Sequence, residues 1–175
     1  ATKVSKTKAH GELMVGAAEV WGIQSISGDS IVIRMVQQVA PKSGDDVAIL
    51  TIGPIGNYAV KACETLAEQG ISAAHYDMRF AKPIDEMLLH EVFGKFKHVI
   101  TVEDGCVQGG MGSAVVEFMA DNGYNAQVKR LGIPDEYIEH GTQDQLYAEC
   151  GYDVAGMVRT AVELVGKQAA QSLGA

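Results

Sequence analysis

The strongest constraint on the fold is a regular alternation of apolar runs and amphipathic segments that begins at Asp46. Between the apolar runs lie segments with helical spacing, and short turns that contain Gly separate the two kinds of segment. The apolar runs predict buried strands at residues 47–52, 71–76, 98–102 and 126–131. Because parallel strands need crossover connections, this alternation predicts an α/β fold with a mostly parallel sheet and helices on both faces.

Polar residues at the start of the amphipathic segments predict where the helices begin, because their side chains can accept hydrogen bonds from unpaired backbone amides. The first helix is expected to run from Tyr58 to about Gln69, where Gly70 stops it. The predicted N-caps are Asn57, Asp85, Ser113, Thr142 and Asp153.

The first part of the chain has a different texture, with scattered Gly, Ser and Lys and one short β-branched run at residues 31–33, which predicts a strand. We therefore expect an irregular segment, a linker or a partly non-native stretch over residues 1–44. One α/β domain should follow over residues 45–167, and a frayed tail over residues 168–175. The start at Ala instead of Met suggests an excised fragment or a processed N-terminus.

The charge of the chain restricts its partners. The formal net charge is -8, which disfavours nucleic acid and an anionic membrane surface. No apolar run reaches the roughly 18 residues that span a membrane, and no secretory signal is apparent. The cysteines are Cys63, Cys106 and Cys150, and their spacing indicates neither a disulfide framework nor a zinc site. We therefore expect a protein of the reducing cytoplasm.

The most unusual stretch runs from Glu103 to Ser113 and follows a predicted strand, at the edge where α/β sheets usually bind ligands. Two interpretations stay open: a site for a ligand or another polypeptide, and a packed turn that lets a helix approach the sheet. Glu103 and Asp104 would repel a phosphate, and no Lys or Arg lies between His98 and Lys129 to offset them. As neighbours on an extended chain they should also point to opposite sides, which argues against a shared acid–base role.

We expect this loop to face another domain or subunit and to hold no free anion. The candidate interface residues are Glu103, Asp104, Gly109, Gly110, Gly112 and Ser113.

Arg34 ends the β-branched run and is the candidate for binding a substrate phosphate through two parallel hydrogen bonds. The alternative is a solvated surface arginine.

Four stretches carry a resemblance to a known family: GDDVAILTIGPIGN, YDMRFAKPIDEMLL, HVITVEDGCVQGGMGSAVVEFMADNGY and RLGIPDEYIEHGTQDQLYAECGYDVAGM. From about residue 45 to residue 158 the chain resembles the C-terminal domain of 1-deoxy-D-xylulose-5-phosphate synthases. The patterns D-x-R-F-x-K-P-x-D and I-P-D-x-x-I-x-H-G-T distinguish it from transketolases and from the beta subunits of 2-oxo-acid dehydrogenases, which share the domain fold. Family members also carry A-x-R-Y-P-R-G before this domain. Arg34 matches the first Arg of that stretch, whereas Met35, Val36 and Gln37 replace its Tyr, Pro and second Arg.

The resemblance implies a three-layer α/β/α domain, with a five-stranded mixed sheet that contains one antiparallel strand, as in the transketolase C-terminal domain. It implies a homodimeric, cytoplasmic transferase that condenses pyruvate with glyceraldehyde 3-phosphate to 1-deoxy-D-xylulose 5-phosphate and carbon dioxide. The parent enzyme uses thiamine diphosphate and magnesium, and its product feeds isoprenoid, thiamine and pyridoxal synthesis.

The family's cofactor residues belong to upstream domains, and the chain lacks the GDG motif of that site. We therefore expect an assembly domain that is inactive alone, carries no catalytic, cofactor-binding or metal residue, and has the upstream domains and the homodimer partner as its partners. The alternatives are an independent small-molecule-binding α/β domain that uses the loop 103–113, and the equivalent domain of a transketolase or a dehydrogenase beta subunit.

Overall fold

The computed structural model describes residues 12–14, 20–27, 30–34 and 44–172, with side chains described from 44 to 166. The chain divides into two compact units, residues 1–40 and 41–175.

The first unit contains a three-stranded antiparallel sheet in the order β1-β2-β3. Its strands are β1 (Glu12–Met14), β2 (Val20–Ser27) and β3 (Ser30–Arg34). β3 confirms the strand expected at residues 31–33. β1 and β2 were not predicted, because β1 is only three residues long and Gly and Ser interrupt the apolar pattern of β2. Arg34 is the last residue of β3 and pairs with Gly22, but its side chain lies outside the described residues.

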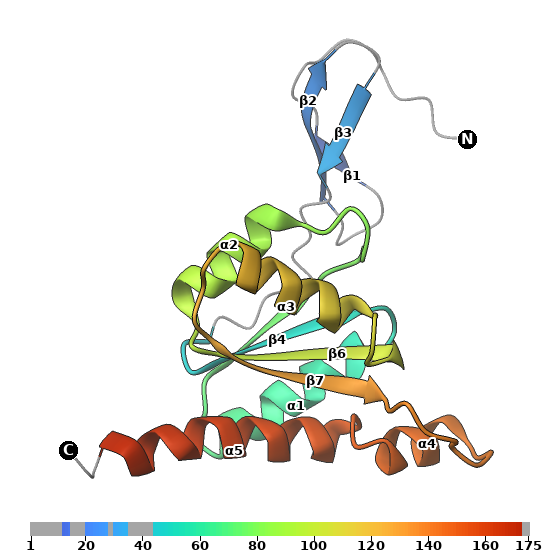
Figure 1. Ribbon diagram of the computed structural model, residues 1–175, viewed down its shortest axis with the longest axis vertical. Coiled ribbons are helices and arrows are strands. Elements are labelled where there is room, and N and C mark those ends of the chain that lie inside the picture. The colour runs from blue at the N-terminus through green and yellow to red at the C-terminus, as the bar shows by residue number, and fades with distance from the viewer. Residues whose placement is uncertain (1–11, 15–19, 28–29, 35–43, 173–175) are drawn as a thin grey trace. The chain divides into compact units, whose positions relative to one another are not determined.

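The second unit is built on a sheet of four parallel strands in the order β5-β4-β6-β7 (Figure 1). The strands are β4 (Val47–Ile52), β5 (Ala73–Asp77), β6 (His98–Cys106) and β7 (Gln127–Ile133). All four predicted strands are therefore present, and no hairpin joins them. The described residues of this unit hold four strands and not five, and no antiparallel strand extends this sheet. The expected fifth strand came from the family resemblance alone, without an apolar run of its own.

Five helices cover the two faces of this sheet in the described residues. They are α1 (Gly56–Glu68), α2 (Glu86–Lys95), α3 (Met111–Asp121), α4 (Gln143–Glu149) and α5 (Val154–Ser172). Helices α1 and α5 lie on one face, and α2 and α3 lie on the other (Figure 1). This arrangement confirms the three-layer α/β/α prediction.

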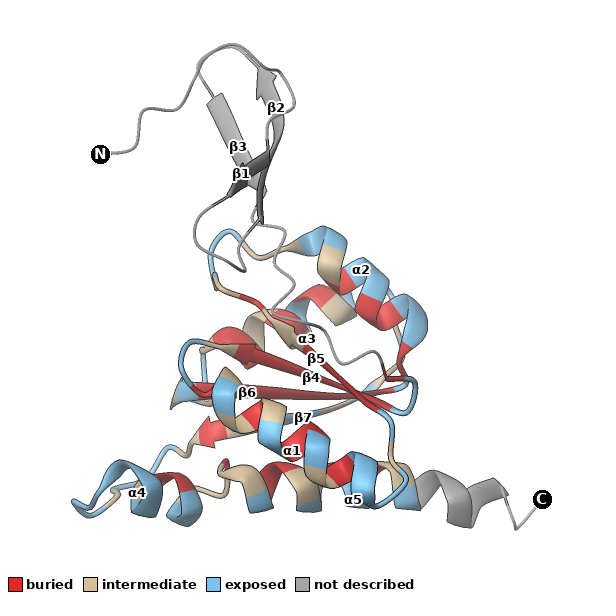
Figure 2. Ribbon diagram, turned by 180° about the vertical axis from the view of Figure 1, so that it is seen from behind, coloured by how far each residue is buried: buried red, intermediate tan, exposed pale blue. Residues whose placement is uncertain are grey.

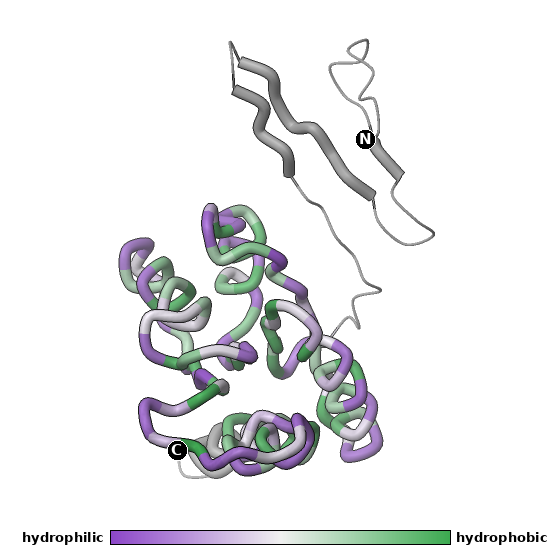
Figure 3. The backbone as a smooth tube through the Cα atoms, turned by 90° about the vertical axis from the view of Figure 1, so that its right-hand side faces the viewer, coloured by the Kyte–Doolittle hydropathy of each residue, from purple (hydrophilic) through white to green (hydrophobic). Residues whose placement is uncertain are grey.

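The alternating side chains of β4 show why its apolar run is continuous. Val47 and Ile49 face α1 and α5, whereas Ala48 and Leu50 face α2 and α3, and all four are fully buried. A strand covered on both faces has no solvent side, so it carries no alternating polar residues. Figure 2 shows the central strands as the most buried part of the unit, and Figure 3 shows that the helices carry both hydrophobic and hydrophilic residues.

Three of the predicted helix caps are confirmed. Asp85 accepts a hydrogen bond from the Leu88 amide at 3.0 Å, and Asp153 accepts one from the Gly156 amide at 2.8 Å. Thr142 forms a capping box with Gln145 at the start of α4. Gly70 also ends α1 as predicted, with a φ of 77°.

Two predicted caps are wrong. Asn57 lies inside α1, whose N-cap is Ile55, because the preceding turn already begins to wind: the Asn57 amide donates to the Pro54 carbonyl at 3.1 Å. Ser113 lies inside α3, whose N-cap is Gly110. The carboxylate of Glu103 in β6 accepts hydrogen bonds from the first amides of α3 instead.

Candidate functional site

The carboxyl ends of β4 and β6 form the switch point of the sheet, because the chain turns to β5 on one side of β4 and to β6 on the other. Open α/β sheets usually bind ligands at this edge. The stretch 103–113 lies here. Its first four residues, through Cys106, continue β6 instead of forming a loop, and Cys106 pairs with Ile133 of β7 after an irregularity.

Glu103 is buried and binds the start of α3. Its carboxylate accepts hydrogen bonds from the Met111 amide at 2.7 Å and from the Gly112 amide at 2.9 Å. The first amides of a helix have no acceptor within the helix, and the helix dipole favours a negative charge at this end. The Glu103 carboxylate therefore occupies the position that a bound anion would take.

The glycines of the stretch permit this close approach of α3 to β6. A Cβ on Gly110 would meet the Glu103 carboxylate and the Cys106 carbonyl, and a Cβ on Gly112 would meet the Thr101 hydroxyl. Gly109 has a φ of 74°, a conformation that side chains disfavour. These contacts support the packed-turn interpretation for the interior of the stretch.

Ser113 and Arg130 close the turn. The Ser113 hydroxyl accepts hydrogen bonds from the Gly109 amide at 2.9 Å and from Arg130 Nη1 at 2.7 Å, and it donates to the Val107 carbonyl at 3.1 Å. Arg130 Nη1 also donates to the Val107 carbonyl at 2.9 Å. No Lys or Arg was predicted near the stretch, because Arg130 belongs to β7 and is distant in sequence.

Asp104 points to the other face of the sheet, as predicted for a neighbour of Glu103. Its Oδ2 accepts a hydrogen bond from the Tyr147 hydroxyl at 2.7 Å, and its Oδ1 accepts one from the Tyr152 hydroxyl at 3.0 Å. Tyr147 lies in α4 and Tyr152 follows it, and both rings are buried. The sequence analysis did not predict a role for either tyrosine at this site. Both belong to the buried cluster that packs α4 and the following turn against the sheet.

The two tyrosines remain hydrogen-bond donors at neutral pH. Burial, followed by the hydrogen bond to Asp104, raises the pKa of Tyr147 to about 12. The same causes raise the pKa of Tyr152. Gln143 Nε2 donates to the Tyr147 hydroxyl at 2.8 Å, which completes a network between β6 and α4.

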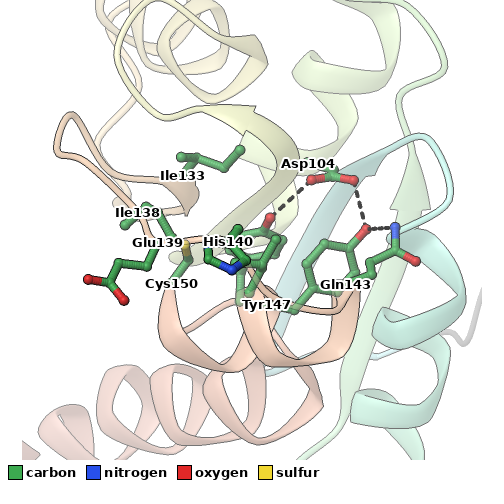
Figure 4. Close-up of a pocket in the computed structure, with 10 residues that line it drawn as sticks. Asp104, Ile133, Ile138, Glu139, His140, Gln143, Tyr147 and Cys150 are labelled. Atoms are coloured by element: carbon green, nitrogen blue, oxygen red, sulfur yellow. Dashed lines mark hydrogen bonds between the residues drawn. The ribbon is translucent and has the colours of Figure 1, made fainter.

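A pocket of about 420 Å³ opens beside Asp104 (Figure 4). Its walls come from the end of β7, from the connection at residues 138–140 and from α4. Cys150 lines the pocket, and the pKa of its thiol is raised, mainly by burial, so its thiolate form is disfavoured. Among residues 44–166 and the described strands before them, no group of three His, Cys, Asp or Glu side chains could hold a metal ion.

Residues 37–157 match the family model described as transketolase, C-terminal domain. The chain belongs to this family.

This transketolase C-terminal domain has close relatives among longer enzymes. It is 63% identical over 123 residues to the 1-deoxy-D-xylulose-5-phosphate synthase of Cytophaga hutchinsonii, a match that covers 70% of the chain and 19% of the relative. It is 56% identical over 119 residues to the synthase of the same name from Bacteroides fragilis, which covers 67% of the chain and 18% of the relative. These relatives confirm the resemblance found in the four sequence stretches. The chain spans about a fifth of their length, 18–19%.

A solved structure, "Split gene transketolase, inactive beta4 tetramer", shares the fold of this transketolase C-terminal domain. The TM-score is 0.65 at 32% identity, and the match covers 71% of this chain and 40% of that one.

The side chains at the switch point of this domain hold layers together. Both oxygens of Glu103 bind amides of α3, and both oxygens of Asp104 bind tyrosines of the opposite layer. The donors to these carboxylates are backbone amides and tyrosine hydroxyls, and the raised pKa values of both tyrosines disfavour their ionised form. The arrangement therefore favours a fixed surface at the carboxyl edge of the sheet over an acid–base pair.

Proposed function

We propose that this chain is the C-terminal assembly domain of a 1-deoxy-D-xylulose-5-phosphate synthase. The observation that carries the proposal is 63% identity over 123 residues to a synthase of which those residues make up 19%. The parent reaction joins pyruvate and glyceraldehyde 3-phosphate to give 1-deoxy-D-xylulose 5-phosphate and carbon dioxide. The parent is a cytoplasmic homodimer that uses thiamine diphosphate and Mg²⁺ and serves isoprenoid and thiamine synthesis.

The described residues do not fit the cofactor. The amides at the start of α3 already donate to Glu103, and the same part of the chain offers no cluster of three metal-binding side chains. We therefore expect thiamine diphosphate and Mg²⁺ to bind to the remainder of the parent polypeptide. The 175-residue chain should show no synthase activity and no Mg²⁺-dependent binding of thiamine diphosphate in calorimetry. Micromolar binding would contradict this assignment.

A domain exchange tests the proposed function directly. Residues 45–167 would replace the matching domain of the Cytophaga hutchinsonii synthase, and the chimera should keep synthase activity, because 63% of the aligned residues are identical. The matched control inserts the corresponding domain of the split gene transketolase, which is 32% identical to this chain and should not restore activity. A chimera with residues 45–167 that folds but is inactive would count against the proposal.

The stretch 103–113 is the proposed contact with the rest of the parent enzyme. Asp104, Cys106, Gln108 and Gly109 are exposed at the carboxyl edge of the sheet, and the small glycines let another surface approach the backbone. Because Glu103 already occupies the helix start, we expect no free anion here. Titration with phosphate or pyrophosphate should leave the amide NMR signals of residues 109–113 unchanged. Saturable shifts of these signals would favour the independent binding domain instead.

Arg34 is the proposed contact for a substrate phosphate, since it matches the first arginine of the family stretch. In the full-length parent, Arg34→Ala should raise the KM for glyceraldehyde 3-phosphate and leave the KM for pyruvate unchanged. An equal effect on both substrates would argue for a structural role.

A further inference from the structure

The pocket beside Asp104 has two acidic side chains and one histidine in its lining. Its ten lining residues include Asp104 and Glu139 and contain no Lys or Arg. Figure 4 shows Asp104 and Glu139 on opposite sides of the lining residues, with His140 between them. Glu136 and Glu149 also lie near enough to act on the Cys150 thiol, which lines the same pocket. The formal charges of the lining carboxylates are therefore not offset by a Lys or Arg in the lining.

Two tyrosine hydroxyls hold the Asp104 carboxylate in place. Each of its oxygens accepts one tyrosine hydroxyl, and both tyrosine rings are buried. A carboxylate has about four acceptor sites, so lone pairs remain for further donors. Within the described part of the chain, no Lys or Arg forms an ion pair with Asp104. Binding of a cation to Asp104 would cost little side-chain entropy of the carboxylate, because the two tyrosines already restrict its conformation.

The walls of the pocket suit a long basic side chain. Its volume, about 420 Å³, is within the range of roughly 300–1,000 Å³ for ligand sites. Ile133, Ile138 and Leu146 provide apolar surface along which the methylene groups of a lysine or arginine can pack. Tyr137 directly precedes the lining residue Ile138 and is 89% exposed. A large exposed aromatic side chain is typical of a surface that another protein surface covers.

We propose that this pocket receives an arginine or lysine side chain from the part of the parent polypeptide that lies outside this chain. The inference rests on the proposed function and names the chemistry of the partner surface. Relatives are about five times longer than the matched region, which makes up 19% of the first of them, so a large surface is available to supply the side chain. The pocket also shares Asp104 with the proposed contact stretch 103–113, so one partner surface can cover both.

The test uses N-acetyl-arginine amide as a probe in saturation-transfer NMR. The 175-residue chain should bind the probe weakly, with about millimolar affinity for a single charge pair, and should not bind N-acetyl-glutamate amide. Asp104→Asn should weaken probe binding about tenfold, because it removes the charge and keeps the shape. The control Asp144→Asn changes a carboxylate that binds Tyr58 outside the pocket, and it should leave probe binding unchanged. Glu139→Gln, at an exposed position, should weaken binding without a risk to folding.

The full-length parent enzyme decides the identity of the occupant. It should not bind the probe, because its own basic side chain fills the pocket. Equal binding of the probe by the full-length enzyme and the 175-residue chain would overturn the proposal and indicate a site for a free amine. Self-association of the chain that Asp104→Asn abolishes would overturn it in favour of a second copy, and absence of probe binding to the chain would overturn it outright. These outcomes are independent of whether the domain-exchange chimera is active.

Discussion

Gly110 shows how the close packing of α3 depends on the absence of a single methyl group. Its Cβ position is already occupied by the Glu103 carboxylate and the Cys106 carbonyl, and the latter is backbone that cannot rotate away. The amides that Glu103 binds follow directly, at Met111 and Gly112.

We therefore expect Gly110→Ala to lower the free energy of unfolding by about 1–3 kcal/mol, the usual cost of overpacking. Urea denaturation measures the change. The matched control is Gly94→Ala in α2, where an added Cβ meets nothing within 4 Å. That variant should be more stable by about 0.5–1 kcal/mol, because Ala favours the helix over Gly. A neutral result at Gly110 would show that the turn relaxes easily.

The tyrosines around Asp104 predict a loss of stability at alkaline pH. The pKa of Tyr147 is about 12 in the folded chain, above the ordinary value of 10.0. Below about pH 10 the Tyr147 hydroxyl keeps its proton in both the folded and the unfolded chain, so its contribution to the stability of the fold is complete. Between about pH 10 and 12 the unfolded chain binds fewer protons, so stability falls as the pH rises.

Tyr147→Phe should make this decline shallower, as measured by urea unfolding between about pH 8 and 11. Tyr137→Phe, at an exposed position, should keep the wild-type slope. Identical slopes for all three proteins would exclude the Tyr147 hydroxyl as the cause.

At the scale of elements, local signals determine some helix starts and distant residues determine others. Asp85, Thr142 and Asp153 were predictable because each caps amides three residues away. The start of α3 was not predictable in this way, because Glu103 reaches it from β6, eight and nine residues upstream. Ser113 has a typical cap residue type, but its hydroxyl binds within the turn instead.

The capping box of α4 gives a prediction at this scale. Thr142→Ala should lower the free energy of unfolding by about 1 kcal/mol, because the Gln145 amide loses its acceptor. Thermal unfolding measures the loss, and Thr142→Ser, which keeps the hydroxyl, should remain close to the wild type. If Thr142→Ser lowers the stability as much as Thr142→Ala, the loss comes from the missing methyl group and not from the missing cap.

For the whole molecule, the sequence predicted the order of elements and the parallel sheet of the second unit, because apolar runs and crossover lengths are properties of contiguous residues. It did not predict the pocket or the tyrosine network, since Asp104 lies 43 residues from Tyr147 and 48 from Tyr152. The fifth strand that the family resemblance implied is absent from the described residues of this sheet, and β1 and β2 were not predicted. Contacts between distant residues depend on how the layers pack, which periodicity does not encode.

Glu103 and Asp104 are consecutive residues, and this has a consequence for local unfolding of the domain. One strand end binds α3 on one face and the α4 region on the other, so fraying of that strand end releases both layers together. Amide hydrogen exchange should therefore report one cooperative opening unit that joins the first turn of α3 to α4, although the sheet separates them. Glu103→Gln should accelerate exchange at both places, including α4, which Glu103 does not touch. Faster exchange in α3 alone would mean that the two layers open independently.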